Sequence, residues 1–136
     1  PPAIAGKLDV YKILRFVRSE AFRRICGAED VLRELAFITS LPAAEVMTAQ
    51  GRALTDGPAA DAGVLVQGIA DIVLVYPDHL ELLDYKTDRR KTSADFVRAY
   101  RAQLELYAKA IEKRFAPRRV TYKGIYSLEL GELIEV

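Results

Sequence analysis

Cysteine, histidine and tryptophan are nearly missing from this chain, which has one Cys, one His and no Trp in 136 residues. The lone cysteine, Cys26, excludes an internal disulfide. It also excludes an iron–sulfur cluster or a Cys-rich zinc site built from this segment alone. Cys26 falls within a helical pattern, where we expect a small buried apolar side chain. His79 falls in a turn, and we interpret it as a surface residue rather than as a metal ligand or a general base.

Long apolar runs are missing as well. No stretch approaches the length of about 18 apolar residues that a transmembrane helix requires, so we expect no membrane contact. The first residues, Pro1 to Ala3, lack the charged region and apolar core of a secretory signal peptide. Together with the single cysteine, these absences favour a reducing, cytoplasmic location.

The chain has an ordinary globular composition and an uneven distribution of charge. It is 51% hydrophobic and 29% charged, which suits one domain with a real core. The formal net charge is +1, but basic residues dominate from Lys86 to Arg101 and again from Lys109 to Lys123. Such runs usually form a solvated helix face, and the alternative is a surface that attracts a polyanion. The first run supplies the candidate nucleic-acid contacts, which are Arg89, Arg90, Lys91, Arg98 and Arg101.

The first half of the chain shows a helical pattern followed by a strand and a loop. Apolar residues at spacings of three and four predict a helix from Leu8 to Cys26, with a break near Ser19. β-Forming residues predict a strand over Val31–Thr39. The stretch Leu41–Asp61 contains two prolines and two glycines, and we expect a loop there around a weak strand at Glu45–Thr48.

The second half predicts one long helix and two closing strands. Thr92 is a suitable N-cap, and apolar residues extend the helical pattern to about Phe115. Strands are then expected over Arg119–Leu128 and Leu133–Val136, joined by a turn at Gly131.

The middle of the chain is organised as a hairpin. Two β-branched-rich runs, Val64–Tyr76 and Leu80–Lys86, flank the turn signal Pro-Asp-His. A loop of two or of four residues makes the numbers of facing residues sum to 155. Asp71 then lies opposite Asp84, and residues that face each other across a ladder share one face of the sheet. Lys86 lies two residues beyond Asp84 and projects from that same face.

Two opposed carboxylates repel each other, so folding alone gives no reason to place them there. Carboxylate oxygens are the ligands that Mg²⁺ and Mn²⁺ prefer, and a nearby Lys adds positive charge for a phosphate. The alternative is that Asp71 and Asp84 point to solvent, with Lys86 as a partner in a surface ion pair. Glu34, in the preceding strand, is a further candidate acid, and an edge-strand carboxylate facing water is an equally good interpretation of it.

An amide lies on the apolar face of the predicted long helix. Gln103 and Tyr107 are four residues apart and therefore stack on one helix face among apolar neighbours. A buried amide needs hydrogen-bond partners, so Gln103 indicates a specific contact. A solvent-exposed position at the edge of that face is the alternative.

Three motifs occur in a fixed order. They are Gly68-Ile-Ala-Asp71, then LDYKTD over Leu83–Asp88, then QLELY over Gln103–Tyr107. In this order they resemble the signature of the RecB-type branch of the PD-(D/E)XK nucleases. Within it the resemblance is greatest to the C-terminal nuclease domains of AddA-type helicase–nuclease subunits, and it extends at least from Arg33 to Val136. It implies a restriction-endonuclease-like α/β (α+β) core, with a central mixed sheet flanked by helices.

The resemblance also implies roles for individual residues. Asp71 and Asp84 would bind Mg²⁺ or Mn²⁺, with the Tyr85 backbone carbonyl as a further ligand. Lys86 would position the attacking water and stabilise charge on the scissile phosphate. Gln103 and Tyr107 match the QxxxY element, which supports the site and contacts DNA near it.

One family feature is missing from this sequence. Members carry, upstream of these motifs, a helix with a metal-binding His in a context like G-T-x-x-H, and no such motif occurs here. We therefore interpret residues 1–136 as a single nuclease domain, in a fragment that lacks the first core helix of the family and the upstream helicase region.

The expected function is metal-dependent hydrolysis of DNA by an exonuclease domain of an AddAB/RecBCD-type helicase–nuclease in double-strand break repair and recombination. The partners that this implies are DNA and a second, AddB-like subunit. Two alternatives remain open at this point. One is a DNA-binding or assembly module whose nuclease fold does not cleave, and the other is a Cas4-like or phage-type nuclease of the same fold.

Overall fold

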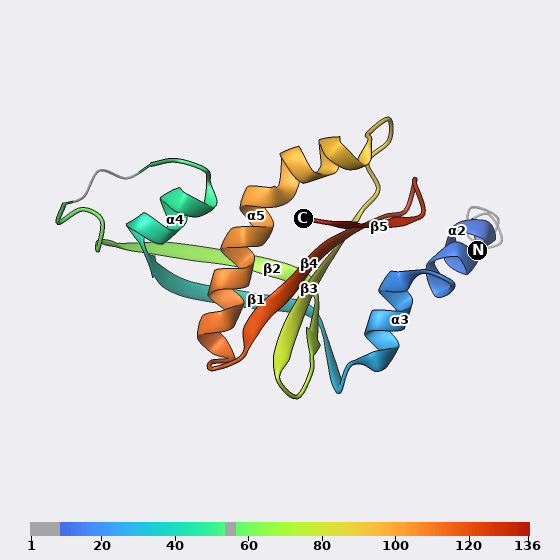
Figure 1. Cartoon of the computed structure of the whole chain (residues 1–136), viewed down its shortest axis with the longest axis horizontal. Helices are drawn as coiled ribbons and strands as arrows, with labels where there is room; N and C mark the ends of the chain where they lie inside the picture. Colours follow the sequence, from blue (N-terminus) through green and yellow to red (C-terminus); the bar gives the residue numbers. More distant parts are fainter. Residues whose placement is uncertain (1–8, 54–56) are drawn as a thin grey trace, which may run out of the picture.

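The computed structural model describes residues 9–53 and 57–136. Its core is a five-stranded sheet whose strands lie in chain order. The strands are β1 (Asp30–Pro42), β2 (Gly63–Val75), β3 (His79–Lys86), β4 (Arg119–Ser127) and β5 (Glu132–Glu135). β3 and β4 pair in parallel and the other neighbours pair antiparallel, so the sheet is mixed (Figure 1). The expected mixed sheet flanked by helices is confirmed.

The parallel pair exists because a long helix connects its two strands. Helix α5 (Ser93–Arg114) begins at a capping box, in which the Thr92 and Asp95 side chains each bind the other's backbone N–H. Its apolar face packs Phe96, Leu104 and Ile111 onto one face of the sheet. The predicted helix and both closing strands are therefore confirmed.

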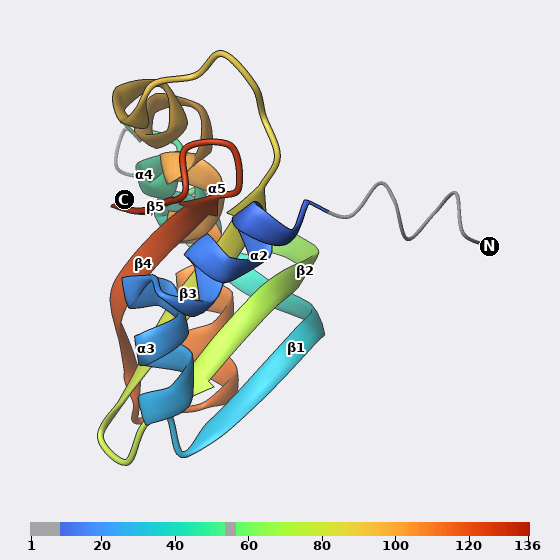
Figure 2. The ribbon, with the colours of Figure 1, turned by 90° about the vertical axis from the view of Figure 1, so that its right-hand side faces the viewer.

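Two short helices cover the opposite face of the sheet (Figure 2). They are α2 (Val10–Val17) and α3 (Glu20–Gly27), separated at Ser19, whose Oγ accepts a hydrogen bond from the Phe22 N–H at 3.3 Å. The predicted break is thus confirmed, whereas Leu8 lies outside the described residues. The expectation for Cys26 is wrong: its side chain is exposed, because it lies on the outer face of α3.

An ion pair fastens α3 to the sheet. Arg24 Nη1 lies 2.8 Å from Oε1 of Glu81, a buried residue of β3, and the guanidinium stacks 3.6 Å from the centroid of the Tyr122 ring. The Tyr76 hydroxyl donates to the Arg24 carbonyl at 2.6 Å. These contacts keep α3 over β3 and β4, on the side of the sheet away from α5.

The predicted hairpin register is confirmed over the four pairs of the β2–β3 ladder, which ends one residue short of Asp71 and Asp84. Ile72 pairs with Leu83 and Val75 pairs with Leu80, so the numbers of facing residues sum to 155 along the ladder. Val75 faces α5 together with Leu80, whereas Ile72 and Leu83 face the N-terminal helices. This alternation is what a sheet covered on both faces requires.

The alternation of β2 changes phase around Asp71. Val73 belongs to the core under α5, and so does Ala70, three residues earlier. On β1, which pairs Arg33 with Ile72 and Leu35 with Ala70, the intervening Glu34 has a φ of 49°. A left-handed residue inside a strand interrupts the regular pleat. The irregularity therefore lies beside the predicted carboxylate.

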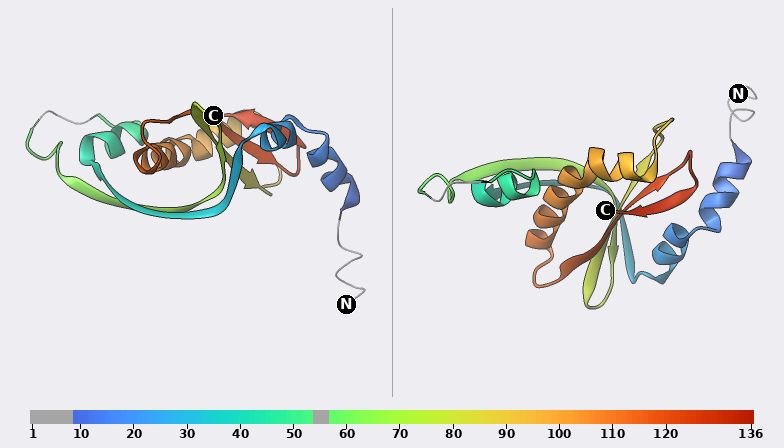
Figure 3. Two further views of the ribbon diagram at one scale, coloured as in Figure 1. Left: turned by 90° about the horizontal axis from the view of Figure 1, so that it is seen from below. Right: turned by 45° about the horizontal axis from the view of Figure 1, so that its top comes forward.

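The prediction of a weak strand at Glu45–Thr48 is wrong. These residues belong to helix α4 (Ala43–Ala49), which packs Val46 against Leu41 and Val66. The segment is rich in alanine, a strong helix former, and it follows Pro42 at the N-cap. β1 and β2 pair far beyond the last β2–β3 pair, and α4 covers this extension (Figure 3).

Among the helices of residues 9–53 and 57–136, none combines the length and apolar character that crossing a membrane requires.

Candidate active site

The last residues of β3 carry a buried charged pair. Asp84 is 7% exposed, and Lys86 Nζ lies 2.8 Å from its Oδ2. Asp84 and Lys86 project toward α5, because they continue the alternation of the buried Leu80 and Leu82. Asp84 Oδ2 is nevertheless fully enclosed without a hydrogen-bond partner of good geometry in the described chain. The ion pair alone therefore leaves acceptor capacity at this oxygen unused.

Asp71 reaches the same end of β3 from β2. Its Oδ2 accepts a hydrogen bond from the Tyr85 backbone N–H at 2.9 Å. The β2–β3 ladder ends at the pair Ile72 and Leu83, so the Asp71 carboxylate replaces the next ladder acceptor. Tyr85 thus contributes its N–H to hold Asp71 in place. Its backbone carbonyl, predicted to be a metal ligand, stays a prediction.

The carboxylates of Asp71 and Asp84 interact electrostatically. Burial, followed by the neighbouring Asp71, raises the pKa of Asp84 to about 6, and Lys86 offsets only part of that rise. Burial lowers the pKa of Lys86, but the hydrogen bond and charge of Asp84 outweigh it, so the pKa of Lys86 is raised overall. Lys86 stays an ammonium group, while Asp84 is a carboxylate held at an energetic cost.

These residues fit a hard divalent cation. A positive ion next to Asp71 and Asp84 converts their repulsion into attraction, and it would share the enclosed Asp84 Oδ2 with the Lys86 ammonium. Mg²⁺ is commonly held by one or two carboxylates, with waters and substrate oxygens completing its coordination. In the described part of the chain, no group of three or more His, Cys, Asp or Glu side chains is close enough together to hold a metal ion.

Glu34 lies near this site without joining it. It lines a hollow of about 380 Å³ together with Arg33, Asp71 and Tyr85. The Glu34 side chain is exposed, on the left-handed residue of β1. Of the two interpretations from the sequence, the structure favours a carboxylate that faces water.

Gln103 and Tyr107 are brought together on α5. Gln103 Nε2 donates to the Tyr107 hydroxyl at 3.3 Å, and Gln103 is exposed rather than buried. The Tyr107 ring packs edge-on against Phe37, with centroids 4.8 Å apart. Gly68 of β2 lies beneath this ring. The expectation of a buried amide is therefore wrong and the alternative holds: Gln103 lies at the solvent-exposed edge of the helix face, where Tyr107 is its hydrogen-bond partner.

Gly68 leaves the space that Tyr107 occupies, which makes Gly68→Ala a direct test of this packing. A Cβ at position 68 would lie 2.6 Å from the Tyr107 hydroxyl and 2.9 Å from Cζ of Phe37. We expect Gly68→Ala to lower the free energy of unfolding by about 1–2 kcal/mol in urea denaturation. The cost of overpacking in the folded state outweighs the stabilisation that Ala gives by lowering the entropy of the unfolded chain. Gly57→Ala is the control, since nothing lies within 4 Å of its Cβ position. Equal stability of the two variants would show that Tyr107 does not need this gap.

The predicted DNA-binding residues do not form one surface. Arg89 and Arg90 are exposed in the loop after β3, near the carboxylates in sequence. Lys91 pairs with Asp88, Nζ to Oδ2, at 2.5 Å. The remaining pair, Arg98 and Arg101, lines a hollow with Gln50 and Gly51, which follow α4. By helical spacing this is the side of α5 away from Gln103 and Tyr107.

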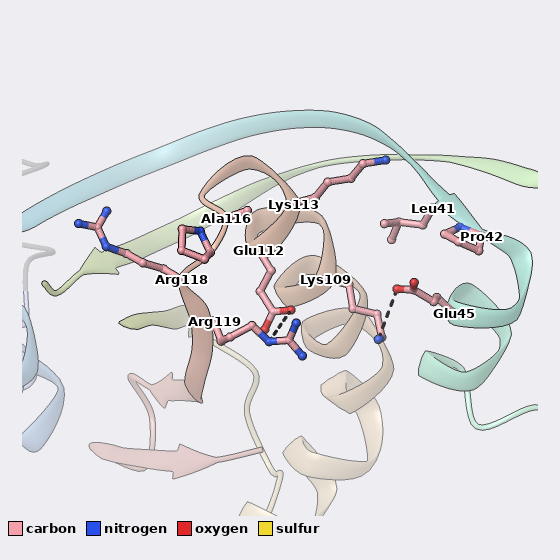
Figure 4. Close-up of a pocket in the computed structure, with 10 residues that line it drawn as sticks. Leu41, Pro42, Glu45, Lys109, Glu112, Lys113, Ala116, Arg118 and Arg119 are labelled. Carbon is pink, nitrogen blue, oxygen red and sulfur yellow. Dashed lines mark ion pairs between the residues drawn. The ribbon is translucent and has the colours of Figure 1, made fainter. Parts of the chain in front are cut away.

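A larger hollow of about 700 Å³ lies between α4 and the end of α5 (Figure 4). Four of its charged side chains form two ion pairs: Lys109 Nζ lies 3.5 Å from Glu45 Oε2, and Arg119 Nε lies 3.8 Å from Glu112 Oε2. None of the predicted catalytic residues lines it. Size alone therefore does not identify the active site in this protein.

The motifs did not single out two residues that contact this site. The Tyr100 ring lies 4.3 Å from Lys86 Nζ, and the Tyr100 hydroxyl donates to Asp88 Oδ2 at 2.7 Å. Both lie in or near the quoted stretches, since Asp88 ends LDYKTD and Tyr100 lies three residues before Gln103. The helical spacing of Tyr100 and Gln103 was a signal, but the contact of Tyr100 with Lys86 depends on how α5 crosses the sheet.

Comparison with known proteins agrees with this arrangement. Residues 8–132 match the sequence model of the PD-(D/E)XK nuclease superfamily. The chain is 32% identical over 132 residues to an ATP-dependent helicase/nuclease subunit from Ligilactobacillus salivarius (strain UCC118). It is 30% identical over 129 residues to the protein of the same name from Clostridium botulinum (strain 657 / Type Ba4).

These alignments cover 96% and 95% of this chain but 10% of each relative, so the chain spans about one tenth of their length. The mixed sheet, the order of the motifs and the match over nearly the whole chain all indicate the same nuclease fold. The resemblance to AddA-type subunits noted in the sequence is confirmed at this level. The chain belongs to the PD-(D/E)XK nuclease superfamily.

Proposed function

We propose that this chain is a Mg²⁺-dependent deoxyribonuclease domain that hydrolyses phosphodiester bonds in DNA, with Mn²⁺ as a substitute cation. The observation that carries the proposal is the end of the β2–β3 ladder away from the turn, where Asp71 and the buried Asp84 lie beside the Lys86 ammonium. Two carboxylates that can hold a divalent cation, next to one Lys, can supply metal-dependent hydrolysis of a phosphodiester. The superfamily match and the name of the relatives support the same chemistry.

The divalent cation, when bound, would polarise the scissile phosphate and lower the pKa of a water. Asp71 and Asp84 would hold it, and the Tyr85 N–H keeps Asp71 oriented toward the site. Lys86 would orient the attacking water and offset the negative charge that develops on the phosphate oxygens. Gln103 and Tyr107, hydrogen-bonded to each other on α5, would support the site and contact DNA near it.

The wider role that we propose follows from the relatives. They are named as subunits of an ATP-dependent helicase/nuclease, and this chain corresponds to about one tenth of their length. We infer that it serves as the exonuclease domain of an AddAB/RecBCD-type helicase–nuclease in break repair and recombination, beside a second, AddB-like subunit. Arg89 and Arg90 would contact the DNA backbone next to the site, and such contacts position DNA without reading its sequence.

Calorimetric titration with Mn²⁺ tests the metal assignment without requiring cleavage. We expect saturable binding to the wild-type chain and no binding to Asp84→Asn, because the Asn side chain lacks the charge that opposes the cation. Asp78→Asn is the matched control, since this acid is 86% exposed in the β2–β3 turn. Binding that survives in Asp84→Asn, or is lost in Asp78→Asn, contradicts the proposed site. A chain that binds DNA without any response to Mg²⁺ would be a non-cleaving module instead.

A further inference from the structure

The ammonium group of Lys86 is enclosed between two different groups. Its Nζ lies 2.8 Å from Asp84 Oδ2 and 4.3 Å from the centroid of the Tyr100 ring. The side chain is only 21% exposed. A lysine has a flexible four-carbon stem, so a single ion pair restrains the distance to one atom but not the direction of the ammonium. The ring supplies a second restraint.

The Tyr100 ring is itself held from two sides. Its hydroxyl donates to Asp88 Oδ2 at 2.7 Å, and Lys91 Nζ binds the same carboxylate. The ring also lies against Phe96, which is fully buried, with centroids 6.2 Å apart. Asp88 therefore anchors the polar end of Tyr100, while Phe96 supports the face of the ring.

These contacts connect the strand to the helix beside the carboxylates. Asp88 follows Lys86 by two residues in the chain, and Tyr100 lies two turns into α5. The loop between them ends at the capping box of Thr92, so the start of α5 is well defined. Tyr100 thus contacts Lys86 from an ordered helix, and its hydrogen bond to Asp88 holds the loop that begins after Lys86.

We propose that Tyr100 is a positioning residue whose ring holds the Lys86 ammonium against Asp84, in the orientation needed at the scissile phosphate. The attraction between a cation and the negative face of an aromatic ring provides the restraint. This inference rests on the proposed nuclease function for its catalytic meaning. Tyr100 does not contact the reacting groups in this scheme, and it acts only through Lys86.

Tyr100 also packs against the core under α5, so a simple loss of folding must be separated from a loss of positioning. Tyr100→Phe keeps the ring and removes the hydroxyl that binds Asp88. Tyr100→Leu removes the ring and keeps an apolar side chain of reasonable size. Tyr11→Leu is the control for tyrosine loss, because Tyr11 is 80% exposed on α2.

The geometry is tested by NMR without any need for activity. Protons above an aromatic ring are shielded, so the Lys86 ε-methylene resonance is expected upfield of those of lysines that face no aromatic ring in the wild-type chain. Lys91, whose Nζ lies 5.0 Å from the centroid of the same Tyr100 ring, is expected to be shifted as well, so the Lys86 resonance has to be assigned individually. The shift is expected to persist in Tyr100→Phe and in Tyr11→Leu, and to disappear in Tyr100→Leu. An unshifted Lys86 resonance in the wild type overturns the proposal.

The catalytic consequence is tested by steady-state cleavage of a DNA oligonucleotide with Mg²⁺. We expect Tyr100→Leu to lower kcat about tenfold with KM unchanged, an effect of about 1.4 kcal/mol on the barrier. Tyr100→Phe should recover most of kcat, which a purely structural role of the hydroxyl would not predict. Equal kcat in wild type and a folded Tyr100→Leu overturns the proposal. A wild type that does not cleave contradicts the proposed function rather than the role of Tyr100. In that case the NMR shift still tests whether the Tyr100 ring holds Lys86.

Discussion

Asp71→Asn is expected to lower the rate of DNA cleavage by a factor of about 1,000 or more, while the affinity for DNA changes little. The cation contributes several kcal/mol of charge stabilisation in the transition state, and about 1.4 kcal/mol corresponds to a factor of ten in rate. Asn keeps the size of Asp71 and still offers an oxygen to the Tyr85 N–H. The variant therefore removes the charge and preserves the local hydrogen bond.

Two quantities are measured, the cleavage rate and the DNA affinity, and only the cleavage rate is expected to fall. Single-turnover cleavage in Mg²⁺ reports the chemical step, and fluorescence anisotropy with a chelator present reports DNA binding. Affinity should persist, because basic residues outside the metal site, such as the exposed Arg89 and Arg90, supply the backbone contacts. Asp78→Asn serves as the control for the loss of one negative charge. An Asp71→Asn chain that cleaves at the wild-type rate would falsify the assignment of Asp71.

The register of the hairpin that carries the candidate site could be predicted because a hairpin register is a local property. The turn fixes which residues face each other, and Ile72 pairs with Leu83 as that argument requires. The same local reasoning could not find the change of phase around Asp71. That change depends on the partner strand β1, where Glu34 adopts a left-handed backbone conformation that is uncommon for a glutamate and could not be predicted from its residue type.

Two errors have a common physical origin. Glu45–Thr48 was expected to be a weak strand, and the structure places it in α4, whose Val46 is buried against the β1–β2 extension. Cys26 was expected to be buried and is exposed. In short segments the periodicity is ambiguous, so the tertiary partner decides between helix and strand, and between inside and outside.

The arginine-rich run shows how a cluster in sequence separates in space. Arg89 and Arg90 are exposed in the loop that follows β3, whereas Arg98 and Arg101 lie on another side of α5. A helix turns by about 100° per residue, so charges that are adjacent in a run need not share a surface. The proposed contacts with DNA are therefore best supported for the loop residues.

Asp84→Asn is expected to stabilise the cation-free chain, although it removes the proposed metal site. The folded chain holds Asp84 with a pKa raised to about 6, above the ordinary value of 3.8, because the carboxylate is buried beside Asp71. A raised pKa means that the folded state binds the proton more tightly than the unfolded state does. Ionisation of Asp84 thus destabilises the fold, by up to about 3 kcal/mol for a shift of this size. Asn resembles the neutral acid and avoids that cost.

The pH dependence gives this prediction its sign. In wild type, the free-energy cost of ionising Asp84 in the folded state is small below about pH 4. This cost grows as pH rises toward about 6, because the folded state binds more protons than the unfolded state between these pH values, and it is constant above about 6. Urea denaturation with a chelator should therefore show Asp84→Asn as more stable than wild type at about pH 8 and equal to it near pH 4. Excess Mg²⁺ should stabilise wild type at the higher pH and leave Asp84→Asn unchanged, because only wild type binds the cation in its folded state. If Asp84→Asn were less stable than wild type at the higher pH without metal, the Lys86 ion pair would outweigh the repulsion from Asp71. Asp84 would then serve to stabilise the fold through Lys86, and the fold would carry no carboxylate repulsion for a cation to remove.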